Sequence, residues 1–139
     1  MKKYVLILAL LLYYFSPKAQ TFEDNNLKMR ISEIENRTAL RELVDTFSIL
    51  ADKKEVQKQT ELFTESAIVE TYRNGELVSR LEGPKEIGVA FENFLKNFEA
   101  VYHFNGQHLV SINGDKATGI LYCTTYLIRS ENGKKIKTT

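Results

Sequence analysis

The C-terminal part of the chain contains two long runs rich in β-branched and aromatic residues, at positions 101–112 and 116–129. Only Asn113-Gly114-Asp115 separates them, and Asn-Gly is a strong signal for a tight turn because both residues tolerate a positive φ. The two runs therefore predict a long antiparallel hairpin. A second turn at residues 131–133 introduces a short final strand at residues 134–139.

This final segment predicts an exposed sheet edge. It is short and ends Lys-Ile-Lys-Thr-Thr, so a sheet with this last member keeps an open edge and an under-covered inner face. We therefore expect one or two further strands to follow Thr139 in the native protein.

Two helices are predicted by apolar residues at helical spacing before the first strand. Residues 27–51 predict a helix with one buried face, starting at residue 27 or at the capping-box residue Ser32. The polar residues 21–26 predict a frayed lead-in. Asp52 and Glu55 repeat the capping-box spacing and predict a short second helix at an angle to the first. The stripe of the first helix consists of Ile31, Ile34, Leu40, Leu43, Val44, Phe47, Leu50 and Ala51.

A short hairpin and a third helix follow. Residues 67–72 and 77–81 alternate with a two-residue period around Asn74-Gly75, which suits a two-residue turn. Pro84 follows Gly83 and is suited to the first position of a helix. The apolar stripe of this third helix consists of Ile87, Phe91, Phe94, Leu95 and Phe98.

The third helix allows two interpretations of its aromatic stripe. The first is a core face, and the second is a ligand wall that includes Phe91 and Phe94. Both agree if the core is hollow. Helices followed by mainly antiparallel strands define an α+β fold.

The N-terminus predicts a cleavable signal peptide at residues 1–20. Lys2 and Lys3 precede an apolar run at residues 4–15, and residues 16–20 supply a helix breaker and a small residue near a cleavage site. The apolar run is about 12 residues long, below the roughly 20 that cross a bilayer. We expect an exported protein, periplasmic or secreted, without a stable membrane anchor after cleavage.

Cleavage after Gln20 leaves 119 of the 139 residues, enough for one domain at residues 21–139. It removes three lysines and no acid, so the 19 basic and 18 acidic residues become 16 and 18, and nothing favours nucleic acid as a partner. Cys123 is the only cysteine, which excludes an internal disulfide and a cysteine-rich metal site. The sequence has no phosphate loop, nucleophile elbow or metal-spaced cluster, so we expect neither cofactor nor metal.

The order of several short motifs is similar to the SnoaL-like proteins of the nuclear transport factor 2-like superfamily, over roughly residues 31–128. The motifs are Ala51-Asp52 at a helix end, Glu61 to Ala67 before a strand, Gly83 to Ile87 opening a helix, His103-Phe104, and Asn113 to Ala117. The resemblance implies a cone-shaped fold, with about three N-terminal helices packed on a strongly curved sheet around a pocket. Members include polyketide cyclases, ketosteroid isomerases and scytalone dehydratase.

The resemblance also implies a catalytic pair. Asp52 and His103 match the positions where dehydratase-like members keep an acid-base pair, and this chemistry requires no metal. Where the dehydratase has a tyrosine before the aspartate, this chain has Ala51, which cannot donate that hydrogen bond. The dehydratase activity itself is therefore not carried over.

Each of these residues also has a structural interpretation. Asp52 is placed to act as an N-cap of the second helix. His103 is alternatively a half-buried strand histidine satisfied by a nearby carbonyl, and His108 would lie on the opposite face of a regular strand. Cys123 is expected to be a small buried apolar residue.

Two strand registers remain open. A tight turn at Asn113-Gly114 pairs His103 with Thr124, which makes Tyr122, Thr124 and Tyr126 candidate ligand-binding residues on the face of His103. A bulge at Gly106 instead moves His103 onto the face of Leu121, Cys123 and Thr125.

Three classes of function agree with these features. The first is a binding domain whose pocket holds a small, largely apolar molecule. The second is a lyase or isomerase that acts on a small carbonyl compound through Asp52 and His103. The third is an interaction module that forms a homodimer through the open sheet face.

Overall fold

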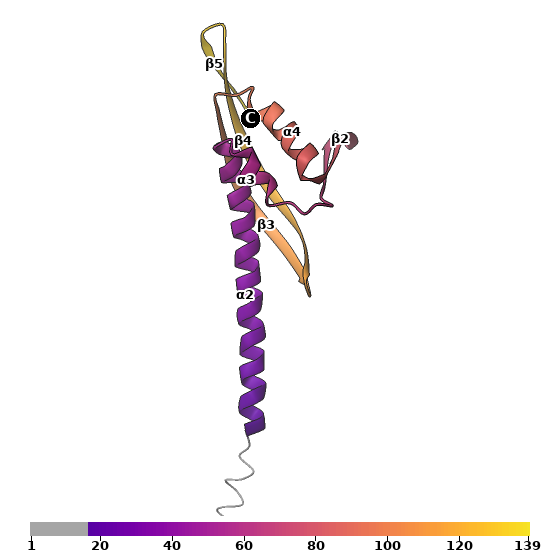
Figure 1. The fold of residues 1–139 in the computed structure, drawn as a ribbon. Coiled ribbons are helices and arrows are strands. Elements are labelled where there is room, and N and C mark those ends of the chain that lie inside the picture. Colours follow the sequence, from indigo (N-terminus) through magenta and orange to yellow (C-terminus); the bar gives the residue numbers. More distant parts are fainter. Residues whose placement is uncertain (1–16) are drawn as a thin grey trace, which may run out of the picture. The chain divides into compact units, whose positions relative to one another are not determined.

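The computed structural model describes residues 17–139, with side chains from Asp24 onward. The chain divides into two compact units, Met1–Ala39 and Leu40–Thr139 (Figure 1). Most of the predicted signal peptide, residues 1–16, lies outside the described residues. None of the helices in the described part of the chain is both long enough and apolar enough to be a candidate membrane span.

The first described helix is longer than the sequence predicts. Helix α2 spans Pro17–Asp52, so residues 21–26 are helical rather than frayed, and the helix begins before residue 27 or Ser32. The physical reason is that Pro17 suits a first helical position and no later proline or glycine interrupts the segment.

The predicted burial of the apolar stripe is wrong for its N-terminal end. Ile31 and Ile34 are 45% and 63% exposed, whereas Ser48 and Ala51 are buried near the end of the helix. An apolar stripe is buried only where other elements cover it, and helical spacing alone does not say how far that cover extends.

Helix α2 ends in a Schellman motif. The N–H of Glu55 donates to the carbonyl of Leu50 at 2.9 Å, and the N–H of Lys54 donates to the carbonyl of Ala51 at 3.0 Å. Lys54 has φ 57°, the left-handed conformation that usually selects glycine here. Its ammonium group donates to the carbonyls of Phe98 and Glu99, so the end of the helix is tied to the segment that enters β3.

We expect Lys54→Met to destabilise the protein more than Lys54→Gly, by about 1 kcal/mol, in urea unfolding. Both variants lose the side-chain bonds to Phe98 and Glu99, but only glycine adopts the positive φ without cost. Equal stabilities of the two variants would contradict this account of the helix end.

The middle elements agree with their predicted order. Helix α3 spans Val56–Thr60, strands β1 and β2 span Ile68–Arg73 and Glu76–Glu82, and helix α4 spans Gly83–Leu95. Strands β1 and β2 pair antiparallel around Asn74-Gly75, whose φ values of 52° and 85° are those a two-residue turn requires. The predicted hairpin is confirmed.

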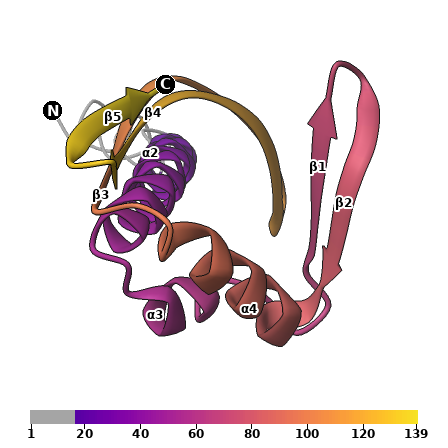
Figure 2. The same cartoon turned by 90° about the horizontal axis from the view of Figure 1, so that it is seen from above.

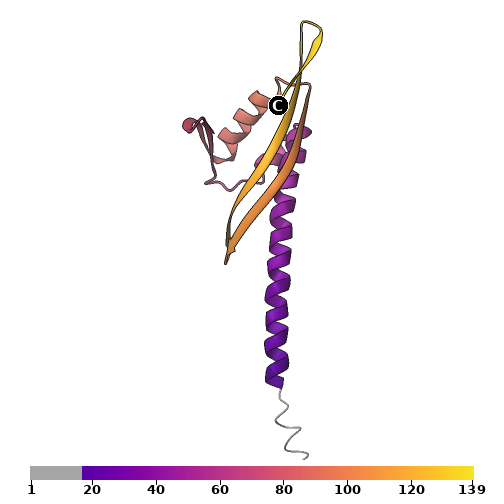
Figure 3. The same cartoon turned by 180° about the vertical axis from the view of Figure 1, so that it is seen from behind.

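The long hairpin is also confirmed. Strands β3, β4 and β5 span Ala100–Asn113, Lys116–Glu131 and Lys134–Thr138 and form an antiparallel sheet in the order β3-β4-β5. Strands β1 and β2 form a separate sheet. Figure 2 shows the strong bend of the β3–β4 hairpin across the top of the view, with the β1–β2 hairpin at the right and α3 and α4 below, and Figure 3 shows β3 and β4 from behind. The α+β expectation is confirmed.

The core of the second unit is small. Val56, Leu95 and Val101 form its buried cluster, and Phe91, Phe98 and Leu127 pack against it. Ile87 on α4 is completely buried. Phe94, which belongs to the same helical stripe, is 51% exposed, so the predicted core face of α4 does not include it.

Candidate functional site

A hollow of about 420 Å³ lies in the second unit. It is large compared with a cavity of about 150 Å³, which already holds benzene. Its walls come from α2, the segment after α3, β1, α4, β3 and β4. The lining residues are Leu43, Val44, Phe47, Ser48, Leu62, Phe63, Val69, Phe91, His103, Asn105, Leu121 and Cys123.

Three phenylalanine rings form one wall of this hollow. The centroids of Phe47, Phe63 and Phe91 lie 5.9 to 6.2 Å apart, in edge-to-face arrangements. Such contacts stabilise a fixed arrangement of rings by about 0.5–1.5 kcal/mol each. Phe91 lines the hollow and also packs against the buried cluster, so its position fits both interpretations of the α4 stripe, and its predicted role in ligand binding stays a prediction.

Phe94 faces a neighbouring, smaller hollow of about 180 Å³. This second space shares Phe47, Phe91 and His103 with the larger one. Phe94 does not line the larger hollow, so a role in ligand binding could apply only in the smaller one.

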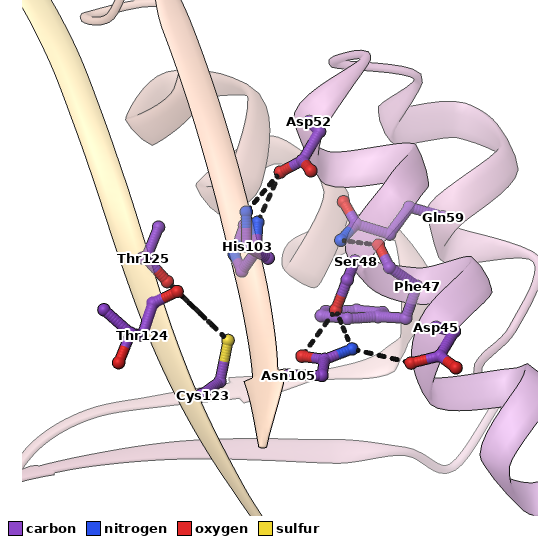
Figure 4. Close-up of polar contacts among 10 residues, drawn as sticks. All are labelled: Asp45, Phe47, Ser48, Asp52, Gln59, His103, Asn105, Cys123, Thr124 and Thr125. Carbon is purple, nitrogen blue, oxygen red and sulfur yellow. Dashed lines mark hydrogen bonds and ion pairs between the residues drawn. The ribbon is translucent and has the colours of Figure 1, made fainter.

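Asp52 and His103 are brought together (Figure 4). Asp52 Oδ1 lies 2.6 Å from His103 Nδ1 and also accepts the backbone N–H of His103 at 3.0 Å. The two side chains are 21% and 18% exposed. The predicted cap role of Asp52 is wrong: Asp52 is the last residue of α2, and the N-cap position of α3 is occupied by Glu55, which makes no side-chain cap bond.

This geometry fixes the proton on the imidazole ring. An ionised carboxylate only accepts hydrogen bonds, so Nδ1 of His103 must carry hydrogen toward Asp52. Nε2 is then the nitrogen with a free lone pair in the neutral ring. Because His103 lines both hollows, the ring presents a base to an apolar space.

A β-bulge decides which sheet face carries His103. The register of β3 and β4 shifts between Asn105 and His108, so His103 pairs with Thr125 and Asn105 pairs with Cys123. Of the two registers that the sequence left open, the structure has the one with the bulge. The bulge also places His108 opposite Leu121, a pocket-lining residue, so the prediction of a regular strand with His108 facing away is wrong.

The candidate ligand-binding residues of β4 lie on the other sheet face. Tyr122, Thr124 and Tyr126 alternate with the pocket-side residues of the strand and line none of the hollow. Tyr122 is 67% exposed, and the ring of Tyr126 carries Lys137 Nζ at 3.8 Å from its centroid. Their predicted place beside His103 is wrong, because the bulge shifts the register by one residue.

Cys123 also differs from the prediction. Its side chain is exposed and lines the hollow rather than being buried in a core. The alternation along β4 places it on the inner face, where the hollow takes the place of packed side chains.

Sequence reasoning missed a polar network beside the pocket (Figure 4). Asn105 Nδ2 donates to Asp45 Oδ1 and to Ser48 Oγ, both at 3.0 Å, and Ser48 Oγ lies 3.1 Å from Asn105 Oδ1. Arg41 donates to Asp45 Oδ2 and to the carbonyl of Gly106 in the bulge. A signal was present, because Asp45, Ser48 and Asp52 follow the spacing of one helix face.

This network holds the pKa of Asp45 below its ordinary value of 3.8, chiefly through the hydrogen bond from Asn105 and also through Arg41, while desolvation opposes the shift. A lowered pKa in the folded state stabilises the protein above pH 3.8, and this stability is lost as the pH falls through the lowered value.

We therefore expect wild type to exceed Asp45→Asn in free energy of unfolding at neutral pH, and the difference to shrink below about pH 3.8. Urea titrations across this range measure it, with Asp115→Asn in an exposed turn as the control. A difference that stays constant with pH would contradict the proposed role of the Asp45 charge.

Comparisons with known proteins agree with this fold. An NTF2-like protein with a cystatin-like fold from Novosphingobium aromaticivorans is 24% identical, with a TM-score of 0.60, and the match covers 81% of this chain and 71% of that one. A protein from the same organism that is named as a scytalone dehydratase is 12% identical, with a TM-score of 0.54. The match covers 78% of this chain and 83% of that one. LinA is 16% identical, with a TM-score of 0.55 and coverages of 78% and 84%.

No curated protein matches the sequence significantly. The family model described as SnoaL-like domain matches residues 32–138, which include α2 from residue 32 to its end and every later element. The chain therefore belongs to the SnoaL-like family and has the NTF2-like fold.

Proposed function

We propose that this protein is a lyase or isomerase that acts on a small, largely apolar carbonyl compound, with His103 as its general base. The observation that carries the proposal is the 2.6 Å contact between Asp52 Oδ1 and His103 Nδ1 at the wall of a 420 Å³ hollow. A carboxylate in this position orients the imidazole and stabilises the imidazolium that forms when Nε2 takes a proton.

The reaction uses the two states of one nitrogen. Nε2 of His103 takes a proton from the carbon next to the substrate carbonyl, and the electron pair of that C–H bond forms a carbon–carbon double bond. In a lyase, the hydroxyl group on the next carbon leaves with its bonding electrons and receives the proton from Nε2 as water. In an isomerase, the same proton returns to a different carbon, and atoms are conserved in both cases.

The apolar wall supports this chemistry. Phe47, Phe63 and Phe91 exclude water from one side of the hollow, which strengthens the interaction of Asp52 with an imidazolium at His103. The Novosphingobium aromaticivorans protein named as a scytalone dehydratase is consistent with a reaction of this class.

A direct test is a screen of β-hydroxy ketones and of β,γ-unsaturated ketones with the purified protein. Loss of water or migration of the double bond is followed by the absorbance of the conjugated ketone. We expect turnover by wild type, loss of at least about 10²-fold in His103→Gln, and little change in His108→Gln, which does not line the hollow. Binding of these ketones without turnover would indicate that the protein is a carrier of apolar molecules and not an enzyme for them. Equal rates in wild type and His103→Gln would show that His103 is not the base.

A second candidate function is homodimerisation through the outer face of the β3–β4–β5 sheet. The observation that favours it is a set of large apolar side chains exposed on this face, which resembles an uncovered interface more than a solvated surface. The residues and their exposed fractions are Tyr102 at 56%, Phe104 at 62%, Leu109 at 72%, Ile120 at 59% and Tyr122 at 67%.

Sedimentation velocity tests this second candidate. We expect a dimer for wild type and a monomer for the double variant Phe104→Glu, Tyr122→Lys, whose charges replace apolar side chains on the exposed face. A monomeric wild type at high micromolar concentration would rule the candidate out. Catalysis does not depend on this outcome, because the hollow is lined by residues of the other sheet face.

We also propose that the protein is exported, on the evidence of Lys2, Lys3 and the apolar run at residues 4–15. Intact-mass measurement of the protein recovered from cells tests this proposal. Loss of about the first 20 residues supports cleavage of a signal peptide, and a full-length soluble chain contradicts it.

A further inference from the structure

The hollow has one polar corner besides His103. Asn105 and Ser48, which we call the Asn105 corner, both line the hollow, one from β3 and the other from α2. Ser48 is 6% exposed, so its hydroxyl is buried. Most of the remaining wall is apolar, and a polar group placed in such a wall fixes the orientation of a ligand.

The amide of Asn105 is held in one orientation. The carboxylate of Asp45 only accepts hydrogen bonds, so the amide nitrogen must face it, at 3.0 Å. Arg41 holds Asp45 in turn through a bond of 3.0 Å and anchors the bulge through the carbonyl of Gly106 at 3.2 Å. The Asn105 oxygen is therefore directed away from Asp45.

The hydrogen-bonding capacity that remains in this corner is of one kind. Both N–H groups of Asn105 Nδ2 are used, one by Asp45 and one by Ser48 Oγ, and the hydroxyl hydrogen of Ser48 is directed to Asn105 Oδ1. An amide oxygen and a hydroxyl oxygen each have two lone pairs, so each retains one. The corner thus presents acceptors and no donor.

We propose that the Asn105 corner is a subsite that selects ligands carrying a hydroxyl or N–H donor, and that it rejects analogues in which this group is a ketone, an ether or a methyl. A ligand oxygen without hydrogen would face only lone pairs there and would lose its bonds to water without replacement. The proposal rests on the proposed binding of a small molecule in this hollow and deepens it.

The strand geometry adds the spacing of the ligand groups. His103 and Asn105 are two residues apart on one face of β3, about 6.6 Å along the strand. A ligand that reaches both groups therefore carries its donor hydroxyl on the side opposite the group that reaches His103. A para-substituted six-membered ring has about this span.

Three matched probes test the subsite without knowledge of the native ligand. p-Cresol carries a hydroxyl, 4-methylanisole replaces it by an ether, and p-xylene replaces it by a methyl. Dissociation constants of the three are measured by NMR titration for wild type, Asn105→Leu and Ser48→Ala. We expect the ratio of the constants for 4-methylanisole and p-cresol to fall by about tenfold in Asn105→Leu, the value of one hydrogen bond, and by less in Ser48→Ala.

A third variant separates polarity from shape. Asp45→Asn keeps the size of the side chain but releases the amide of Asn105 to turn, so we expect it to tighten 4-methylanisole relative to p-cresol. Thr124→Val, on the outer sheet face, is the control and keeps the wild-type ratio. Circular dichroism and urea unfolding establish that each variant is folded.

The outcomes distinguish the two proposals. If none of the probes binds wild type, the proposed ligand binding in the hollow fails, and the subsite fails with it. If the probes bind and the ratio is the same in wild type, Asn105→Leu and Ser48→Ala, the subsite alone is overturned.

Discussion

Asp52→Asn is expected to lower the turnover number by about 10²–10⁴-fold while leaving the fold intact. Asparagine preserves the shape of the side chain and still accepts the backbone N–H of His103. It has no charge to stabilise the imidazolium, and its amide also permits the ring tautomer with hydrogen on Nε2, which cannot take a proton. The measurement is kcat and KM for the ketone that wild type converts.

Two comparisons make this expectation specific. The dissociation constant of p-cresol is expected to stay within about threefold of wild type, because Asp52 does not line the larger hollow. Asp115→Asn, in the exposed turn between β3 and β4, is expected to keep wild-type kcat. A fully active Asp52→Asn protein would show that the carboxylate has only a structural role.

Ile87→Ala is expected to lower the free energy of unfolding by about 2–5 kcal/mol, the largest stability effect of a single substitution proposed for this chain. Ile87 is completely buried on α4, and truncation to alanine leaves a cavity in a unit whose buried cluster is small. Such a loss is a large part of the stability of a domain of this size. Urea unfolding followed by circular dichroism measures it.

Val89→Ala is the matched control on the same helix. Val89 is 56% exposed, so its truncation to alanine is expected to change the free energy of unfolding by no more than about 0.5 kcal/mol. A similar loss in both variants would mean that the burial of Ile87 is not the source of the effect.

The turns of this fold are predictable because their information is local. Asn74-Gly75 and Asn132-Gly133 each form a predicted turn with both residues at positive φ. Between β3 and β4 the prediction of a turn at Asn113-Gly114 is wrong by one residue, because Asn113 pairs with Lys116 and the turn residues are Gly114 and Asp115. A two-residue turn needs only the conformational preference of its own residues. The start of α2 is harder to predict from the sequence, because Pro17 permits a helix start and the polar residues after it neither favour a helix strongly nor end one.

Asp52 shows how local spacing can mislead. Its distance of three residues from Glu55 suits a capping box, but its actual partner is His103, 51 positions away. The family resemblance implied that Asp52 and His103 form an acid-base pair, whereas the spacing of Asp52 and Glu55 favoured a role of Asp52 as an N-cap. A long-range hydrogen bond leaves no periodic signal in the sequence, so only the folded structure reveals which partner a side chain has.

The sheet face of His103 is a second case of this kind. Gly106 is compatible both with a regular strand and with a bulge, and one extra residue reverses the faces of everything beyond it. The choice between them depends on the bend of the β3–β4 hairpin and on Arg41, which binds the Gly106 carbonyl from another element. Neither feature is visible in the residues around Gly106.

One oxygen of Asp52 receives both the main-chain N–H and the ring N–H of His103. During synthesis the carboxylate emerges well before the imidazole, and neither residue alone forms an activated base. In a ribosome-bound or partly unfolded chain this pair is not assembled, so the proposed base forms only when β3 docks against the end of α2.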